Sequence, residues 1–261
     1  MPNVLDFYNK REFFMDKLAK IKAKREEGMG NSDRLNLVIK RTEIFTNAYV
    51  QIKNMSVDQM KKRLHVDFTG EVGIDAGGLT KDFFSELSKE IFNAERKLFC
   101  VASNGSTYYP SPKSNLEKEY VDKFKFIGRV IGKALYEECL LECYFVKPIY
   151  KIVLGEQITL KDLESYDNQL YKAFTWMLAN DITPMDQRFV VEAQYSATGE
   201  DEDLIPGGSH IPVTNENKSQ FLEKLIYYKL YGCIQKQIES FVEGFEELIP
   251  KDLINIFTPN Q

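Results

Sequence analysis

The stretch FTGEVGIDAGGLTKDFF, residues 68–84, joins an extended segment to a helix. Before it, Leu64, Val66 and Phe68 alternate with polar residues, which is the period of a strand with one buried face. Four glycines follow, and Thr80 is placed to cap a helix. Apolar residues then recur at steps of three and four, the period of an amphipathic helix; they are Phe83, Phe84, Leu87 and Ile91. The stretch therefore predicts a strand, a tight turn and a capped helix.

Such a turn could hold a phosphate, because the N–H groups at the start of a helix attract anions. The sequence has neither the Gly-Lys-Ser/Thr ending of a Walker loop nor a GxGxxG pattern. Glu71 and Asp75 would repel a phosphate in the turn, and they are too few for a calcium loop of the EF-hand type. A structural turn is favoured, and a phosphate-using enzyme at residues 73–80 is the remote alternative.

The composition describes an ordinary globular protein. With 261 residues and 43% hydrophobic content, the chain can bury the core of one large domain or two small ones. The net charge is −5 and basic residues are scattered among acidic ones, so nucleic acid is not an expected partner. No apolar run approaches the roughly 20 residues of a membrane span. Four unevenly spaced cysteines and no signal peptide indicate a cytoplasmic or nuclear protein with free thiols.

Further elements follow from the same periods. Residues 35–39 alternate as a strand, and residues 44–52 and 57–63 are expected to be short helices. A longer helix is expected over residues 124–135, with Gly128 and Gly132 four apart on one face. Because glycine costs about 1 kcal/mol against alanine inside a helix, this pair predicts that another backbone lies close against the helix.

From residue 159 to 214 the sequence predicts a small subdomain, inserted into a larger one formed by residues 1–158 and 215–261. Its main helix is expected over residues 160–179, with a possible break near Ser165. One wide apolar stripe runs along it, and Trp176 lies apart near the polar side. Each residue of the stripe is more often core than surface. The functional alternative leaves the edge of the stripe exposed as a protein-binding groove, faced by a strand at residues 189–191.

Three separated stretches resemble the HECT family of ubiquitin ligases. The first is Gly70-Glu71-x-Gly73-x-Asp75-x-Gly77-Gly78-Leu79 followed by Asp82-Phe83-Phe84. The second is the helix at residues 124–135 with Phe145, Pro148 and Leu154-Gly155 downstream; the third is the segment at residues 237–258. Together they cover nearly the whole chain, and the likeness is greatest to the large Huwe1/Tom1 type.

The resemblance implies the N-terminal lobe of a HECT domain, a mostly helical α+β fold with a large helical subdomain and a small inserted α/β subdomain. Members of the family take ubiquitin as a thioester on a cysteine and pass it to a substrate lysine. In the family that cysteine lies in a C-terminal lobe, which is expected to begin after a hinge near Gln261. The resemblance thus implies a ligase fragment that is inactive alone, with no catalytic residue, metal or cofactor of its own.

The four cysteines do not suggest another enzyme. Cys100, Cys139, Cys143 and Cys233 lack the family's His-Thr-Cys-Phe-like context, and each is expected to be buried. Only two histidines in the chain, His65 and His210, could serve as a base, which disfavours a self-contained Cys/His site. Cys139 and Cys143 have helical spacing but no second pair to complete a metal site, so packing is favoured.

The resemblance also implies a partner. The groove of the small subdomain would accept an aromatic or apolar loop of a ubiquitin-conjugating enzyme. Ubiquitin is a further implied partner, and protein substrates would be bound through regions outside this chain. Many relatives have leucine at the position of Phe174. The larger ring here would reshape the pocket, which affects the choice of partner more than binding itself. The implied groove residues are Leu170, Ala173, Phe174, Met177, Phe189, Val191 and Phe221. The alternative is a non-catalytic scaffold that uses the same groove.

Overall fold

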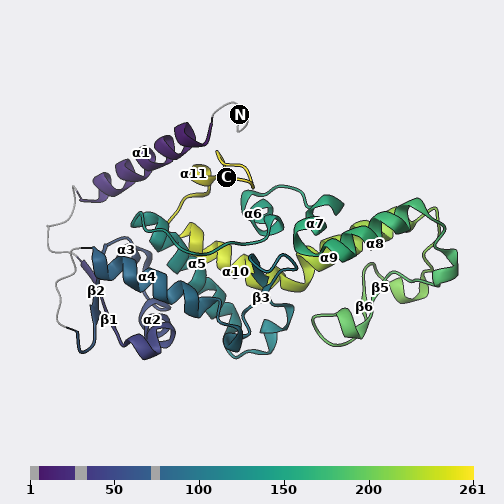
Figure 1. Cartoon of the computed structure of the whole chain (residues 1–261), viewed down its shortest axis with the longest axis horizontal. Coiled ribbons are helices and arrows are strands. Elements are labelled where there is room, and N and C mark those ends of the chain that lie inside the picture. Colours follow the sequence, from purple (N-terminus) through teal and green to yellow (C-terminus); the bar gives the residue numbers. More distant parts are fainter. Residues whose placement is uncertain (1–5, 27–33, 72–76) are drawn as a thin grey trace. The chain divides into compact units, whose positions relative to one another are not determined.

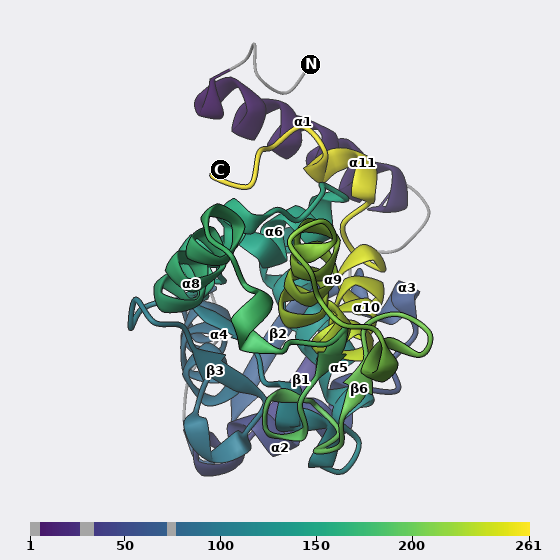
Figure 2. The same cartoon turned by 90° about the vertical axis from the view of Figure 1, so that its right-hand side faces the viewer.

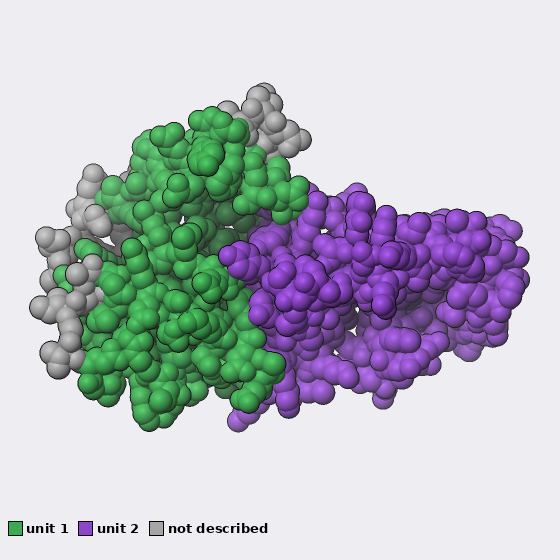
Figure 3. Space-filling model, viewed as in Figure 1, with its two compact units in different colours: residues 1–96, 119–143, 239–261 green, residues 97–118, 144–238 purple. Residues whose placement is uncertain are grey.

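The computed structural model describes residues 6–26, 34–71 and 77–261. The chain is mostly helical with short two-stranded sheets, which confirms the predicted α+β class (Figure 1). It divides into two compact units, which Figure 3 distinguishes by colour. Unit 1 comprises residues 1–96, 119–143 and 239–261, and unit 2 comprises residues 97–118 and 144–238.

Unit 1 contains a parallel pair of strands, β1 (Arg34–Ile39) and β2 (Arg63–Phe68), with Leu35 opposite Leu64 and Ile39 opposite Phe68. The inward-facing side chains of both strands are buried, as the alternation predicts. The helices of this unit are α1 (Phe7–Glu26), α2 (Ile44–Ile52), α3 (Val57–Met60), α4 (Gly78–Ile91), α5 (Tyr120–Tyr136), the larger part of α10 (Gln235–Glu246) and α11 (Lys251–Ile254).

Two predicted boundaries near β2 are wrong. The helix expected over residues 57–63 ends at Met60, because Arg63 already pairs in the sheet. Thr80 does not cap α4: Gly77 holds the N-cap position with a φ of 97°, a left-handed conformation that glycine adopts without strain. Thr80 is instead buried in the first turn. Residues 72–76, which include the predicted turn position Asp75, lie outside the described residues.

The two glycines of α5 lie against a backbone, as predicted, and that backbone belongs to α10 and the residues after it. A Cβ at Gly128 would lie 2.0 Å from the carbonyl oxygen of Phe241, and one at Gly132 would lie 3.1 Å from that of Phe245. Gly244 completes the contact, since its Cβ would lie 2.1 Å from the carbonyl oxygen of Lys125. Glycine on both helices is what allows them to approach this closely.

Helix α1 lies beside α11 in unit 1 (Figure 2). Phe14 and Leu18 are buried, and the ring centroid of Phe14 lies 5.9 Å from that of Phe257. The amino group of Lys10 donates a 2.6 Å hydrogen bond to the side chain of Gln261. These contacts fix the first helix against the last described residues of the chain.

Unit 2 contains two short antiparallel pairs, β3 (Phe99–Val101) with β4 (Tyr108–Pro110) and β5 (Val190–Val191) with β6 (Glu202–Asp203). The break in the long predicted helix falls at Asp167 rather than Ser165, because the Asp167 carboxylate accepts hydrogen bonds from two backbone N–H groups and caps α8. The predicted small subdomain, residues 159–214, lies within this unit and stays a prediction. The helices are α6 (Lys147–Leu154), α7 (Leu163–Tyr166), α8 (Asn168–Ala179) and α9 (Lys218–Leu230).

Candidate functional site

The core of unit 2 forms between α8 and α9, which lie alongside each other (Figure 1). Helix α8 contributes Phe174 and Met177 from its apolar stripe, and α9 contributes one face along most of its length. The segment between the two helices completes the core. The buried residues of the whole core are Leu163, Phe174, Met177, Ile182, Phe189, Val213, Phe221, Leu222, Ile226 and Leu230.

The seven predicted groove residues divide between this core and the surface. Phe189 and Phe221 are in edge-to-face contact with ring centroids 5.5 Å apart. Leu170 is half-buried against the core and Ala173 is exposed. The other five have between 1% and 7% of their surface exposed; they are Phe174, Met177, Phe189, Val191 and Phe221. The structure thus brings these five inside the unit, where they support a surface without forming it.

Part of the exposed surface of α8 is a flank next to Leu170. At about 100° per residue, Gln169, Ala173 and Trp176 lie within one narrow sector, and all three are exposed. The Trp176 side chain is 53% exposed, although tryptophan usually covers much of its ring in the fold. We call these three residues the α8 flank. Sequence reasoning placed Trp176 near the polar side and did not include it among the groove residues; its being the chain's one tryptophan was the available signal.

The end of α8 is held to the start of α9 by a small polar cluster. The Asp181 carboxylate accepts hydrogen bonds from the Thr183 N–H at 2.9 Å and from the Asn215 side chain at 2.6 Å. These hydrogen bonds lower the pKa of Asp181 to about 2. The Lys218 ammonium donates to the Asn180 carbonyl at 2.6 Å. Because these contacts fix the end of α8, the flank is presented on a rigid helix.

A second cluster anchors the loop between β5 and β6. One carboxylate oxygen of Glu202 accepts hydrogen bonds from the hydroxyls of Ser196, Thr198 and Tyr228, the last at 2.8 Å from α9. Burial alone would raise the pKa of Glu202, but these three hydrogen bonds outweigh it and lower the pKa. Burial, together with the hydrogen bond to Glu202, raises the pKa of Tyr228 to about 12.

The Glu202 cluster predicts a pH effect. A carboxyl whose pKa is lower in the folded protein contributes stability that is complete above its unfolded pKa, near 4.3, and that is lost as pH falls through its folded pKa. We expect Glu202→Gln to lower the free energy of unfolding by roughly 1–2 kcal/mol at pH 7 and by less at pH 3. Urea unfolding at both pH values checks this. A difference between the wild type and the variant that grows toward acid pH would contradict the assignment.

The four cysteines are free thiols, and all four are half-buried where burial was expected. Apolar surroundings nonetheless raise the pKa of Cys143, and likewise that of Cys233, to about 12. A thiolate is the reactive form, so these two thiols are inert at neutral pH. Among the described residues, no group of three His, Cys, Asp or Glu side chains could hold a metal ion.

Comparison with known proteins relates the sequence of this chain to a family. The family model described as HECT-domain (ubiquitin-transferase) matches residues 85–261. The chain belongs to the HECT-domain family. It is 39% identical over 259 residues to the E3 ubiquitin-protein ligase TOM1 of Saccharomyces cerevisiae, and 37% identical over 261 residues to the E3 ubiquitin-protein ligase HUWE1 of Mus musculus. The predicted HECT resemblance, including its Huwe1/Tom1 type, is confirmed.

These HECT relatives are far longer than this chain. The matches cover 98–99% of the chain but only 8% of yeast TOM1 and 6% of mouse HUWE1. A probable TOM1 ligase of Eremothecium gossypii, 38% identical, gives the same picture, with 98% of the chain and 8% of that protein aligned. Within the described residues, none of the helices is long and apolar enough to cross a lipid bilayer.

Proposed function

We propose that this chain is the N-terminal lobe of a HECT ubiquitin-protein ligase and that it recruits a ubiquitin-conjugating enzyme charged with ubiquitin. Ubiquitin would pass to a cysteine outside residues 1–261 and then to a substrate lysine, in the cytoplasm or nucleus. The family match supports the ligase role. The raised pKa of Cys143 and Cys233 agrees with a nucleophile that lies elsewhere.

The docking surface that we propose is the α8 flank. The observation that carries this step is the exposed Trp176 ring on a helix whose other face is fixed in the core of unit 2. Large aromatic side chains on rigid supports are the residues that most often dominate the energy of a protein interface. The small Ala173 next to Trp176 leaves space for an apolar side chain of the partner. The half-buried Leu170 would contact that side chain from the core side.

The five buried groove residues have an indirect part in this proposal. Phe174 and Met177 lie on the inner face of α8, Phe189 and Phe221 belong to the same core, and Val191 is buried in β5. Their packing sets the position of the helix and therefore of the flank. Substituting any of them would change stability first and binding only as a consequence.

The test is a titration of the chain with a panel of ubiquitin-conjugating enzymes, in which binding is measured by isothermal calorimetry or NMR. Transient interfaces of this kind bury less than the roughly 1,600 Å² of a standard complex, so we expect weak and rapidly exchanging binding. Trp176→Ala should weaken it at least tenfold, which corresponds to about 1.4 kcal/mol. Ala173→Arg should weaken it by a similar factor, because a long charged side chain would fill the flank without disfavouring the helix.

The matched control is Leu178→Ala. Leu178 is also an exposed apolar residue of α8, with 38% of its surface accessible, but it lies roughly 160° around the helix from Trp176. The Leu178→Ala variant should bind the conjugating enzyme with the affinity of the wild type. Equal losses for Leu178→Ala and Trp176→Ala would refute the flank as the site. Folded protein that binds no conjugating enzyme would favour the scaffold alternative over the whole proposal.

A further inference from the structure

Two arginines lie side by side at the start of the parallel sheet in unit 1. Arg34 opens β1 and Arg63 opens β2, and they are directly paired in the strand register. Both side chains point to the outer face and are exposed. Neighbouring strands are about 4.8 Å apart, and like charges directly opposite each other destabilise a sheet. In the free protein, the positive charges of Arg34 and Arg63 therefore repel each other.

Neither arginine forms an ion pair with any residue in the described part of the chain, and neither does Lys81 of α4. Other surface cations of unit 1 do have acidic partners. Arg41, for example, contacts Glu71 and Asp82, and Lys89 lies 2.6 Å from Glu86. These cations are neutralised within the fold, whereas Arg34, Arg63 and Lys81 are not neutralised by any residue that the structure describes.

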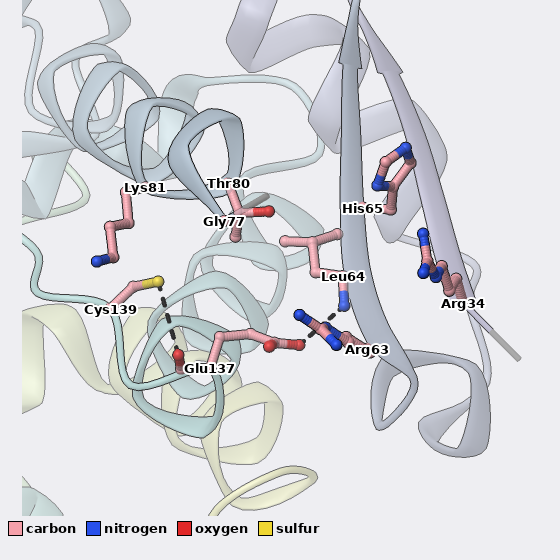
Figure 4. Close-up of a pocket in the computed structure, with 9 residues that line it drawn as sticks. All are labelled: Arg34, Arg63, Leu64, His65, Gly77, Thr80, Lys81, Glu137 and Cys139. Carbon is pink, nitrogen blue, oxygen red and sulfur yellow. Dashed lines mark hydrogen bonds between the residues drawn. The ribbon is translucent and has the colours of Figure 1, made fainter. Parts of the chain in front are cut away.

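The three cations line one cavity of about 160 Å³ (Figure 4). Arg34 and Arg63 come from the strands, and the first turn of α4 provides Lys81. In Figure 4, Lys81 lies across the cavity from the two arginines, with Thr80 and Leu64 between them. The start of a helix carries a partial positive charge, which adds to that of the three side chains. The remaining lining residues are His65, Gly77, Glu137 and Cys139.

Glu137 is the one carboxylate among the described lining residues, and it does not neutralise these cations. Glu137 lies 2.6 Å from the ammonium of Lys133, a buried residue that does not line the cavity. The same carboxylate oxygen accepts a hydrogen bond from the Leu64 N–H at 2.9 Å. Its charge is thus already matched within the fold, and the lining residues that the structure describes carry an excess of positive charge.

We propose that this cavity binds a phosphate monoester group. A guanidinium group can donate paired hydrogen bonds to the oxygens of a phosphate, and Arg34 and Arg63 line the same cavity. A dianion would relieve the repulsion between Arg34 and Arg63 more fully than a carboxylate, which carries one charge. One water occupies about 30 Å³ of liquid volume, so the cavity has room for a phosphate with its ester oxygen at the mouth. The group comes either from a phosphorylated serine or threonine of a partner protein or from a small free phosphate.

This site is separate from the glycine-rich turn, where acidic residues argue against phosphate. Glu71 follows the far end of β2 from Arg63 and is held by the guanidinium of Arg41. The site that we propose lies at the opposite end of the strand, and its charge comes from Arg34, Arg63 and Lys81. It also lies in unit 1, whereas the α8 flank belongs to unit 2, so the two proposals fail independently.

The test measures phosphate binding by the 261-residue chain and by Arg63→Gln. The probes are inorganic phosphate, a phosphoserine peptide and its unphosphorylated form, titrated by NMR or calorimetry at constant ionic strength. Arg63→Gln should weaken binding of phosphate and phosphopeptide at least tenfold. Arg11→Gln is the matched control, since it removes the same charge from an exposed position on α1, outside the cavity; it should bind as the wild type does.

A second measurement separates binding from folding. Without phosphate, Arg63→Gln should melt at the wild-type temperature or above it, because one of two repelling cations is gone. Adding phosphate should raise the melting temperature of the wild type and of Arg11→Gln but not of Arg63→Gln. A phosphopeptide that binds more tightly than free phosphate identifies a partner protein as the source, and equal affinities identify a free phosphate. Equal binding by all three proteins, or no binding by any of them, would overturn the proposal.

Discussion

Gly128→Ala is expected to be one of the most damaging single substitutions in unit 1. The added Cβ would lie 2.0 Å from the Phe241 carbonyl oxygen and 2.9 Å from the Phe245 nitrogen, and both are backbone atoms that cannot rotate away. Extra methyl groups in a tight interior usually cost about 1–3 kcal/mol, and more where the structure cannot yield. We expect a net loss of about 3 kcal/mol or more, even though alanine favours the helix by about 1 kcal/mol. Chemical unfolding followed by far-UV circular dichroism measures this.

Gly78→Ala is the control for that substitution. It makes the same chemical change within a helix of the same unit, but its Cβ would meet no atom within 4 Å. We expect its free energy of unfolding to equal that of the wild type or to exceed it slightly. If Gly128→Ala were as stable as Gly78→Ala, the close contact between α5 and α10 would be wrong.

Phe174→Ala is expected to cost about 3–5 kcal/mol of stability, the range for removing a buried aromatic ring. The side chain is 5% exposed and lies in the core between α8 and α9. Trp176 is the chain's one tryptophan, so its fluorescence reports unfolding of this part of unit 2 directly. The Phe174→Ala transition should occur at clearly lower denaturant concentration than that of the wild type.

The contrasting substitution is Trp176→Ala, two residues along the same helix. Because its side chain is mostly exposed, we expect a change within about 0.5 kcal/mol, measured by far-UV circular dichroism. A loss of partner binding by Phe174→Ala would then reflect a disturbed core, whereas the same loss in Trp176→Ala would reflect the surface itself. Comparable destabilisation by both substitutions would show that the division into core and flank is incorrect.

The sequence was informative where one local pattern had one physical cause. Alternation at Leu64, Val66 and Phe68 requires a strand with one buried face, and paired glycines at 128 and 132 require a close backbone. It was misleading at Thr80, because a threonine before a helix usually caps it. Here Gly77 adopts the left-handed conformation and the helix begins earlier. The residue type of Thr80 alone could not show that Gly77 is the N-cap residue.

The candidate sites depend on contacts between distant segments, which a pattern does not reveal. The apolar stripe of α8 was visible in the sequence, but which edge stays exposed is decided by α9 and by the segment around Phe189. The pairing of Arg34 with Arg63 likewise follows from a parallel register between strands that α2 and α3 separate along the chain. Neither arginine belongs to a motif, so neither could be selected before the strands were placed.

The most direct test of the proposed docking surface is hydrogen–deuterium exchange of the chain, alone and with a saturating ubiquitin-conjugating enzyme. It needs no substitution and covers both units at once. If the α8 flank is the docking surface, binding should slow exchange in peptides that span residues 168–185, which include the flank and the segment after it. Unchanged exchange there, with protection confined to unit 1, would contradict this placement of the docking surface.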